Sequence, residues 1–241
     1  MKVDLHPCYI LHQRPYRETS LILDVFSLVS GRISLVARGA KRGKRGNQAS
    51  LLRPARKLYM AWSIRTDMGT LTTVEPNGPV SDLTGRRLVS CFYMNELLVR
   101  MLHKHESHPE LFQQYEAALA HLEAGFAEER VLRIFEKHLL KSLGYGLVLD
   151  REIVSGGPIV SDARYFYQLD YGPVDHKPVN ARNVEISGKT LQAMNSEDNW
   201  GADISREAKL LLRMALVVHT GERPLASREL YKAYLQNAVT N

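Results

Sequence analysis

Cysteine is scarce in this chain of 241 residues, and long apolar runs are missing from it. The two cysteines, Cys8 and Cys91, form no CxxC pair, so nothing indicates a disulfide framework or a cysteine zinc site. No apolar run approaches the length of a membrane span, and the first residues lack the uninterrupted apolar segment of a signal peptide. We therefore expect a cytoplasmic protein without membrane contact.

Motifs of enzyme chemistry are also missing. The glycine-bearing segment 39–46 invites comparison with a phosphate-binding loop, but its glycine spacing is wrong and no Ser or Thr follows its lysines. No serine lies in a nucleophile elbow, and the acidic residues form no metal-clamping motif. His103, His105 and His108 cluster at the end of an expected helix, where partial negative charge favours imidazolium without a metal. The sequence predicts a binding protein with no catalytic residue, cofactor or metal.

Acidic residues are absent between Asp24 and Asp67, and the charge of the chain is organised around this gap. The window holds ten basic residues, whereas the remainder has 22 basic and 26 acidic ones. A local basic patch attracts polyanions, and phosphodiester backbones suit it because each neutralised phosphate releases counterions. A solvated basic loop is the alternative. We predict a nucleic-acid contact made by nine of these residues: Arg32, Arg38, Lys41, Arg42, Lys44, Arg45, Arg53, Arg56 and Lys57.

Alternation of apolar and polar residues predicts a small β-barrel in the first 78 residues. Strands are expected at 5–14, 19–27, 32–38, 56–63 and 70–74. Five short strands with one long connection are typical of the OB fold, which binds single strands in a basic groove with aromatic stacking platforms. Tyr16, Tyr59 and Trp62 are the candidates for stacking, with burial in the core as the alternative for each.

A helical period follows a linker at 75–79, so the fold class is α+β. Helices are expected at 82–104, from Pro109 onward, at 127–143, 187–196 and 203–219, and from a capping Ser227 to Leu235. Residues 150–185 are irregular, apart from a short strand pair at 163–171. We expect four parts: an OB domain at 1–78, a helical domain at 79–149 and 187–241, and an irregular insertion at 150–186.

Five segments of the chain resemble the RecO family of bacterial recombination mediators. They are HQRPYRETSLILDVFS, GRISLVARGAKRGKR, FYMNELLVRML, LRIFEKHLLKSLGYGL and RPLASRELY, in the order and spacing of that family. The resemblance implies an OB domain and a helical domain. It also implies a protein that binds and anneals single- and double-stranded DNA, contacts the single-stranded-DNA-binding protein (SSB), pairs with RecR and helps to load RecA in RecF-pathway repair, at the nucleoid. Some members carry a four-cysteine zinc ribbon, but this chain has no cysteine at 150–185, so its insertion is zinc-ribbon-like without zinc.

The same resemblance implies a site for the C-terminal tail of SSB, which is acidic and ends in an apolar residue with a free carboxylate. Such a tail needs an apolar pocket beside a cation, and arginine binds a carboxylate better than lysine. The helix at 127–143 offers both, and the predicted tail site is Leu132, Arg133, Phe135, Lys137 and Lys141. The alternative is that this stripe packs into the core. A sequence-nonspecific RNA-binding OB protein remains the alternative function.

Overall fold

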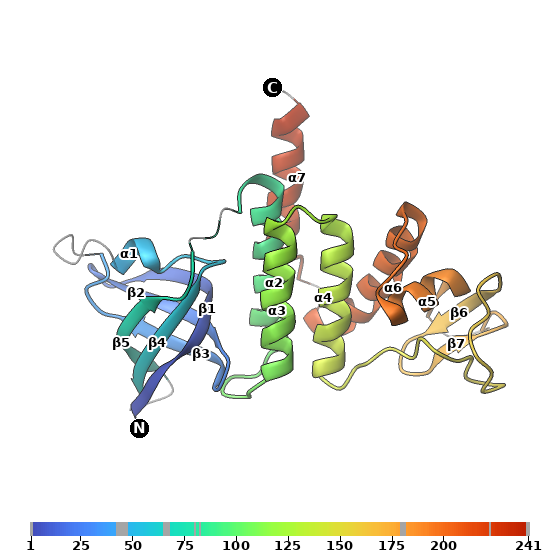
Figure 1. Ribbon diagram of the computed structural model, residues 1–241, viewed down its shortest axis with the longest axis horizontal. Coiled ribbons are helices and arrows are strands. Elements are labelled where there is room, and N and C mark those ends of the chain that lie inside the picture. The colour runs from blue at the N-terminus through green and yellow to red at the C-terminus, as the bar shows by residue number, and fades with distance from the viewer. Residues whose placement is uncertain are drawn as a thin grey trace. The chain divides into compact units, whose positions relative to one another are not determined.

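The computed structural model describes residues 2–41, 48–64, 68–79, 81, 83–178, 182–221 and 223–239 (Figure 1). The chain forms two compact units. The first unit contains Met1–Gly125 and Pro224–Asn241, and the second contains Phe126–Arg223. The four-part division expected from the sequence stays a prediction.

A closed five-stranded barrel opens the first unit, as the sequence predicted. Its strands are β1 (Lys2–Tyr16), β2 (Ser20–Ser27), β3 (Gly31–Ala37), β4 (Lys57–Ile64) and β5 (Gly69–Pro76). The ring closes because β1 pairs with both β2 and β4, while β3 pairs in parallel with β5. Strand β1 is longer than expected because register shifts along it let its two ends follow different neighbours around the barrel.

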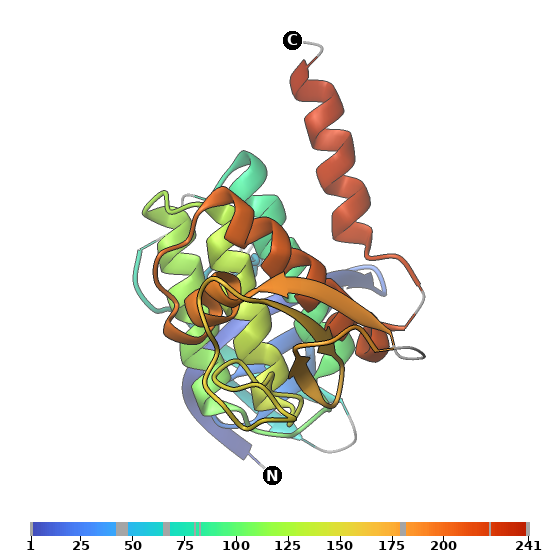
Figure 2. The ribbon, with the colours of Figure 1, turned by 90° about the vertical axis from the view of Figure 1, so that its right-hand side faces the viewer.

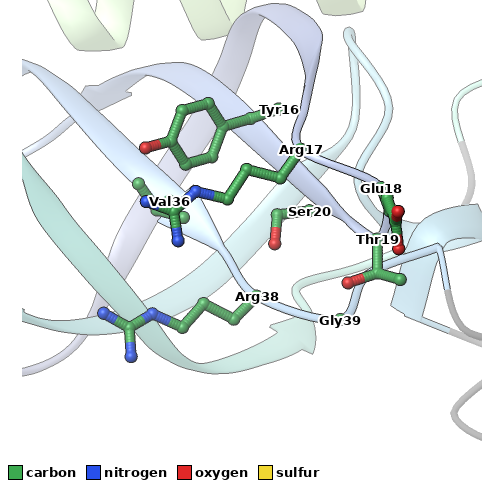
Figure 3. Close-up of a pocket in the computed structure, with 8 residues that line it drawn as sticks. All are labelled: Tyr16, Arg17, Glu18, Thr19, Ser20, Val36, Arg38 and Gly39. Atoms are coloured by element: carbon green, nitrogen blue, oxygen red, sulfur yellow. The ribbon is translucent and has the colours of Figure 1, made fainter.

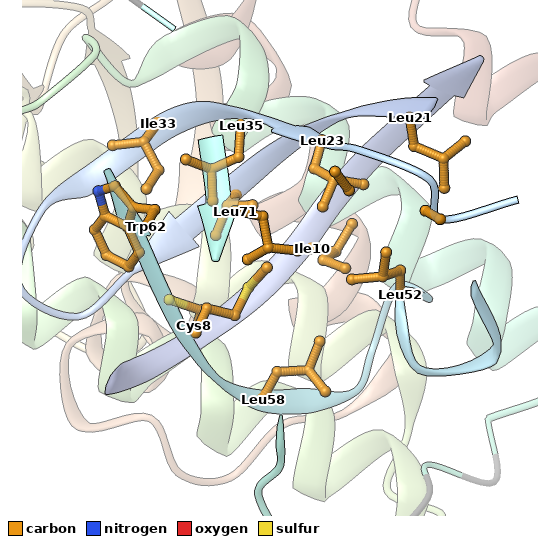
Figure 4. Close-up of a cluster of buried hydrophobic side chains, with 14 residues drawn as sticks. Cys8, Ile10, Leu21, Leu23, Ile33, Leu35, Leu52, Leu58, Trp62 and Leu71 are labelled. Atoms are coloured by element: carbon orange, nitrogen blue, oxygen red, sulfur yellow. The ribbon is translucent and has the colours of Figure 1, made fainter. Parts of the chain in front are cut away.

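The inward side chains of the five strands fill the barrel (Figure 4). Leu58, Met60 and Trp62 alternate along β4, and none of the three is exposed to solvent. Leu52, which follows the short helix α1 (Gln48–Leu51), joins the same cluster. Trp62 is therefore a core residue, and the stacking role considered for it is wrong.

Two helices cover one side of the barrel within the first unit, and each buries an apolar face. They are α2 (Gly85–Met101) and α3 (Pro109–Glu123). Phe112 and Tyr115 of α3 pack their rings against Tyr9 and Phe26 of the barrel at centroid distances of 5.1–6.2 Å. Asn95 of α2 donates to the carbonyl oxygen of Leu11 over 3.0 Å, which fixes α2 against β1.

The last helix, α7 (Ala226–Val239), returns to the first unit and packs against α2. It is the red helix that ends at the C-terminus in Figure 2. Its first two backbone amides, from Ala226 and Ser227, donate to the carboxylate of Glu96 over 3.0 and 2.9 Å. The expectation that Ser227 caps this helix is therefore wrong, because Ser227 lies in the first turn and the cap comes from α2. A carboxylate at a helix N-terminus accepts hydrogen bonds from backbone amides that have no partner within the helix, and its negative charge interacts favourably with the helix dipole.

The second unit combines helices with a small sheet. It contains α4 (Glu128–Ser142), β6 (Arg164–Gln168), β7 (Gly172–Val174), β8 (Asn183–Ser187), α5 (Gly188–Ser196) and α6 (Ala202–Thr220). The three strands form an antiparallel sheet in the order β7-β6-β8, where the sequence predicted only a strand pair in an irregular insertion. The hydroxyls of Tyr165 and Tyr167 accept backbone amides of Val160 and Val148 over 2.9 and 2.8 Å. Buried tyrosines thus hold loops that contain no cysteine.

No helix within the described ranges is both long and apolar enough to cross a membrane.

Candidate nucleic-acid interface

The outer face of the barrel near the β1–β2 turn brings together residues that the sequence separates. Tyr16 pairs with Ser20 across β1 and β2, and Ile22 pairs with Val36 across β2 and β3. Directly opposed residues share one face of a sheet, and the side chains of Leu21 and Ala37 point into the core instead. Tyr16, Ser20 and Val36 therefore share the outer surface.

Arg38 extends this row immediately after β3, and it is exposed. The backbone then turns back, and the amide of Lys41 donates to the carbonyl oxygen of Thr19 over 3.0 Å. This bond ties the start of the basic segment to the β1–β2 turn. Arg38, Lys41 and the turn residue Arg17 consequently lie at one end of the barrel, and all three are exposed.

A hollow lies between these elements (Figure 3). It is lined by Tyr16, Arg17, Glu18, Thr19, Ser20, Val36, Arg38 and Gly39, and it measures about 870 Å³. The Arg17 guanidinium lies over the Tyr16 ring, 5.2 Å from its centroid. Among these lining residues the two arginines outnumber the single acid, Glu18. Anionic ligands are therefore favoured here.

Three of the nine cations predicted to contact nucleic acid are exposed, namely Arg38, Lys41 and Arg53. Arg42, Lys44 and Arg45 fall outside the described residues, so their predicted contacts stay predictions. The structure uses the remaining three differently.

Arg32 and Lys57 hold the barrel to the helices. The Arg32 Nε donates to the carbonyl oxygen of Leu102 over 2.9 Å, and its own carbonyl accepts the amide of His105. Lys57 forms an ion pair with Glu116 of α3. These two cations are occupied by protein partners, so the geometry does not favour them as phosphate ligands. Arg56 is half-buried, and its Nε is buried with no hydrogen-bond partner among the residues that the structure describes.

Two further cations lie near the β1–β2 turn and were not predicted; of these, only Arg17 lines the hollow. Arg14 is exposed on the outer face of β1, where it pairs with Ile22, and Arg17 lies in the turn. Both precede Asp24 and so lie outside the acid-free window that defined the prediction. The pairing of the strands would have found them, because β2 and β3 form a hairpin and the basic segment after β3 therefore lies beside the β1–β2 turn.

The candidate aromatics have three different positions. Tyr16 is half-buried beside the hollow, Tyr59 is 39% exposed on the outer face of β4, and Trp62 lies in the core. Tyr16 is thus the stacking candidate that lies with the cations.

Comparisons with known proteins agree along nearly the whole chain. The family "Recombination protein O N terminal" matches residues 1–80, and "Recombination protein O C terminal" matches residues 83–229. The chain belongs to the RecO family.

Relatives carry the name "DNA repair protein RecO". The protein of Nitrosococcus oceani is 42% identical over 230 residues, which cover 95% of this chain and 93% of the relative. That of Cellvibrio japonicus is 41% identical, covering 96% and 98%, and that of Nitrosospira multiformis is 38% identical, covering 97% and 96%. RecO proteins are DNA repair and recombination proteins, and their N-terminal domain is the OB fold seen here.

The residues predicted for the SSB tail lie on α4 of the second unit, mostly buried or occupied. Phe135 is buried and Leu132 half-buried, so the apolar stripe packs inward. Arg133 is only 8% exposed, and its Nη2 donates to Glu136 over 2.6 Å. This burial and this bond do not favour Arg133 as the ligand of the tail's carboxylate, and that predicted role stays a prediction.

Lys137 and His138 of α4 contact the C-terminal end of α5 and the residue that follows it. Lys137 forms an ion pair with Glu197 and donates to the carbonyl oxygen of Met194 over 2.8 Å. His138 also contacts Glu197, over 2.7 Å. Lys141 alone of the predicted tail cations is exposed. The tail site stays a prediction, and this geometry favours only Lys141 among its cations.

Metal-ligating side chains do not gather within the part of the chain that the structure describes: no group of three or more His, Cys, Asp or Glu residues is close enough to hold an ion. Both thiols are buried in the first unit, and burial raises the pKa of Cys8 and Cys91 to about 12. These thiols are consequently poor nucleophiles.

Proposed function

We propose that this RecO-family protein binds DNA strands at the end of its barrel and anneals complementary strands, without acting as an enzyme. The observation that carries the proposal is the tie between Lys41 and Thr19, which gathers the cations Arg17, Arg38 and Lys41 beside Tyr16. In this role it works in the cytoplasm, at the nucleoid.

Phosphate contacts explain how such a surface binds without reading sequence. Cations that touch the backbone release counterions, and they gain no information from base edges. Annealing needs only that the repulsion between two phosphate backbones be lowered, and a surface that holds both strands does this electrostatically. No covalent step, metal or nucleotide is required.

Salt dependence tests the DNA-binding proposal. Replacing both Arg38 and Lys41 by Ala should weaken binding of a single-stranded oligonucleotide and reduce the slope of log K against log salt by about 0.7 for each phosphate that the variant no longer neutralises. The matched control replaces Lys209 and Arg213, two exposed cations of α6, and changes the net charge equally. An unchanged slope in the first variant, with an intact thermal melt, would contradict the proposal.

The basic segment that follows is tested separately. Replacing Lys41, Arg42, Lys44 and Arg45 together by Ala should weaken DNA binding further and leave the thermal melt nearly unchanged. If this variant binds DNA as well as the parent at moderate salt, the segment is only a solvated surface. Competition between single-stranded DNA, duplex DNA and structured RNA decides between DNA and the alternative RNA ligand.

Annealing is tested with two complementary strands, one carrying a fluorophore and the other a quencher. A chelator or added ATP should leave the rate unchanged, whereas raised salt should abolish the acceleration by the protein. A requirement for magnesium or ATP would contradict an electrostatic mechanism.

We propose the protein partners because the chain belongs to the RecO family, and no described surface carries this part of the proposal. We include in the proposal contact with the SSB tail, pairing with RecR, and loading of RecA on SSB-coated strands. Capture of the protein by intact SSB, but not by SSB without its last residues, is the expected result. Lys141→Ala should weaken that capture, because Lys141 is the exposed cation of the predicted tail site.

A further inference from the structure

We propose that the hollow beside the β1–β2 turn holds one unpaired nucleotide, with its base on the Tyr16 ring and its phosphate between Arg17 and Arg38. This inference rests on the proposed DNA binding and adds a base-dependent contact to it. It makes the barrel end selective for single strands.

The two arginines are placed to hold one phosphate from two sides. Figure 3 shows the side chains of Arg17 and Arg38 extending in the same direction from the turn and from the end of β3. The hydroxyl of Ser20 lies between them in this view, while Glu18 and Thr19 lie at the opposite end. Two guanidinium groups and a hydroxyl are the donors that a phosphodiester oxygen takes.

Backbone bonds set the spacing of these donors. The β1–β2 pairing ends at Tyr16 and Ser20, and the Lys41 amide holds Thr19 against the segment that follows Arg38. The gap between the two arginines is therefore fixed by the sheet and the turn. A site whose backbone is fixed before binding loses less conformational entropy when the ligand arrives.

The conformation of Arg17 indicates that its side chain is needed. Its φ is 52°, in the left-handed region that glycine and asparagine adopt most readily in turns. A non-glycine residue is strained there. The turn nevertheless carries an arginine, which extends over Tyr16.

The Tyr16 ring offers a face to a planar cationic or aromatic group. Arg17 covers it now by a cation–π contact, with 5.2 Å between the guanidinium carbon and the ring centroid. Bases stack both on aromatic rings and on guanidinium planes, so a base can replace or extend this contact. Half-buried Val36 and buried Ile22 give the neighbouring surface an apolar character that suits a base.

Only an unpaired nucleotide fits this arrangement. A base within a duplex is stacked on both faces, and reaching the Tyr16 ring would require flipping it out, which breaks its pairing and its stacking. A single strand has its bases already free. During annealing, pairing with the second strand would withdraw the base from Tyr16, so product formation itself would loosen the hold of the protein.

The test compares oligothymidylate with an abasic backbone of equal length and phosphate number. Tyr16→Leu should weaken binding of oligothymidylate by about 5- to 150-fold, the range measured for one stacked base. Binding of the abasic strand should change by less than about twofold. Tyr16→Phe should bind both strands like the parent, because phenylalanine keeps the ring.

Tyr59→Leu is the matched control, since Tyr59 is an exposed tyrosine elsewhere on the outer barrel face. It should leave both affinities unchanged. An equal loss for both strands in Tyr16→Leu, or no loss for either, overturns the inference. Binding of the abasic strand by the parent protein reports backbone contacts alone. If the inference fails but this binding is still seen and weakens with added salt, the proposed function still holds.

A second measurement does not depend on the folding of a variant. An oligonucleotide carrying 5-iodouracil should photo-crosslink to the parent protein within residues 16–20 or 36–39, the two segments that line the hollow. Crosslinks found only in other segments overturn the inference.

Discussion

Glu207 of α6 joins three elements of the second unit, and its replacement by glutamine is the sharpest test of what holds that unit together. Its Oε2 accepts the amide of Ser187 over 2.9 Å, and the hydroxyls of Ser187 and Thr190 over 2.6 Å each. Its Oε1 accepts from Arg164 over 2.6 Å. The carboxylate thus links α6 to β6, to β8 and to the first turn of α5.

The size of the effect follows from the pKa of Glu207. Burial acts to raise it, but the hydrogen bonds from Ser187, Thr190 and Arg164 outweigh burial and lower the pKa from 4.5 to about 2. A shift of this size corresponds to about 3 kcal/mol, because each unit is worth about 1.4 kcal/mol. The side chain is 19% exposed, so we take about 2 kcal/mol after screening by solvent.

The direction of the Glu207 pKa shift determines the pH range in which this carboxylate stabilises the protein. The folded pKa of Glu207 lies below the unfolded one, so the carboxylate stabilises the second unit fully above about pH 5. This contribution is lost as the pH falls toward 2. Glu207→Gln removes the charge and offers one oxygen where Glu207 has two. It should cost about 2 kcal/mol at pH 7 and flatten the acid dependence of stability below pH 5.

Amide hydrogen exchange of peptides covering β8 and α5 is the appropriate assay, because a chain of two compact units need not unfold in a single transition. Glu185→Gln is the control. Glu185 contacts the same Arg164 but is 54% exposed, so its loss should cost less than about 1 kcal/mol. Protection unchanged in Glu207→Gln, or an acid dependence identical to that of the parent, would refute the reasoning.

Other predictions concern packing. Gly31→Ala should destabilise the first unit strongly, since its Cβ would lie 1.6 Å from the carbonyl oxygen of Glu106. At Gly39 an added Cβ meets no atom of the described residues within 4 Å, so Gly39→Ala should cost only about 1 kcal/mol in thermal melts, because of the positive φ there. Arg133→Ala should cost about 3–5 kcal/mol in urea titrations, because it removes the buried cation that faces Glu136; a well-folded variant would return this arginine to consideration as a tail ligand. The two thiols should stay unreactive toward a disulfide reagent at pH 8 until the protein unfolds, and rapid labelling of the native protein would disprove their burial.

Local pattern was enough to predict the barrel strands and the longer helices, because strand and helix periods are properties of neighbouring residues. It did not predict α1 or the third strand of the β7-β6-β8 sheet. The alternation of Ile33 and Leu35 placed β3, and the stripe through Cys91, Met94 and Leu98 placed α2. In β4 the alternation of Leu58 and Met60 reaches Trp62 two residues later, and this signal for core burial was not used when Trp62 was considered for stacking.

Charge in the sequence determined that a basic surface exists, and only the tertiary structure decided which cations form it. Arg32 and Lys57 belong to the acid-free window, yet they bind Leu102 and Glu116 from distant helices. Arg17 lies outside the window, yet strand pairing and the bond between Lys41 and Thr19 bring it beside Arg38. These partners are far apart along the chain, and no local period encodes them. Composition therefore fixes how much charge a segment carries, while long-range packing decides which of that charge remains free to meet a ligand.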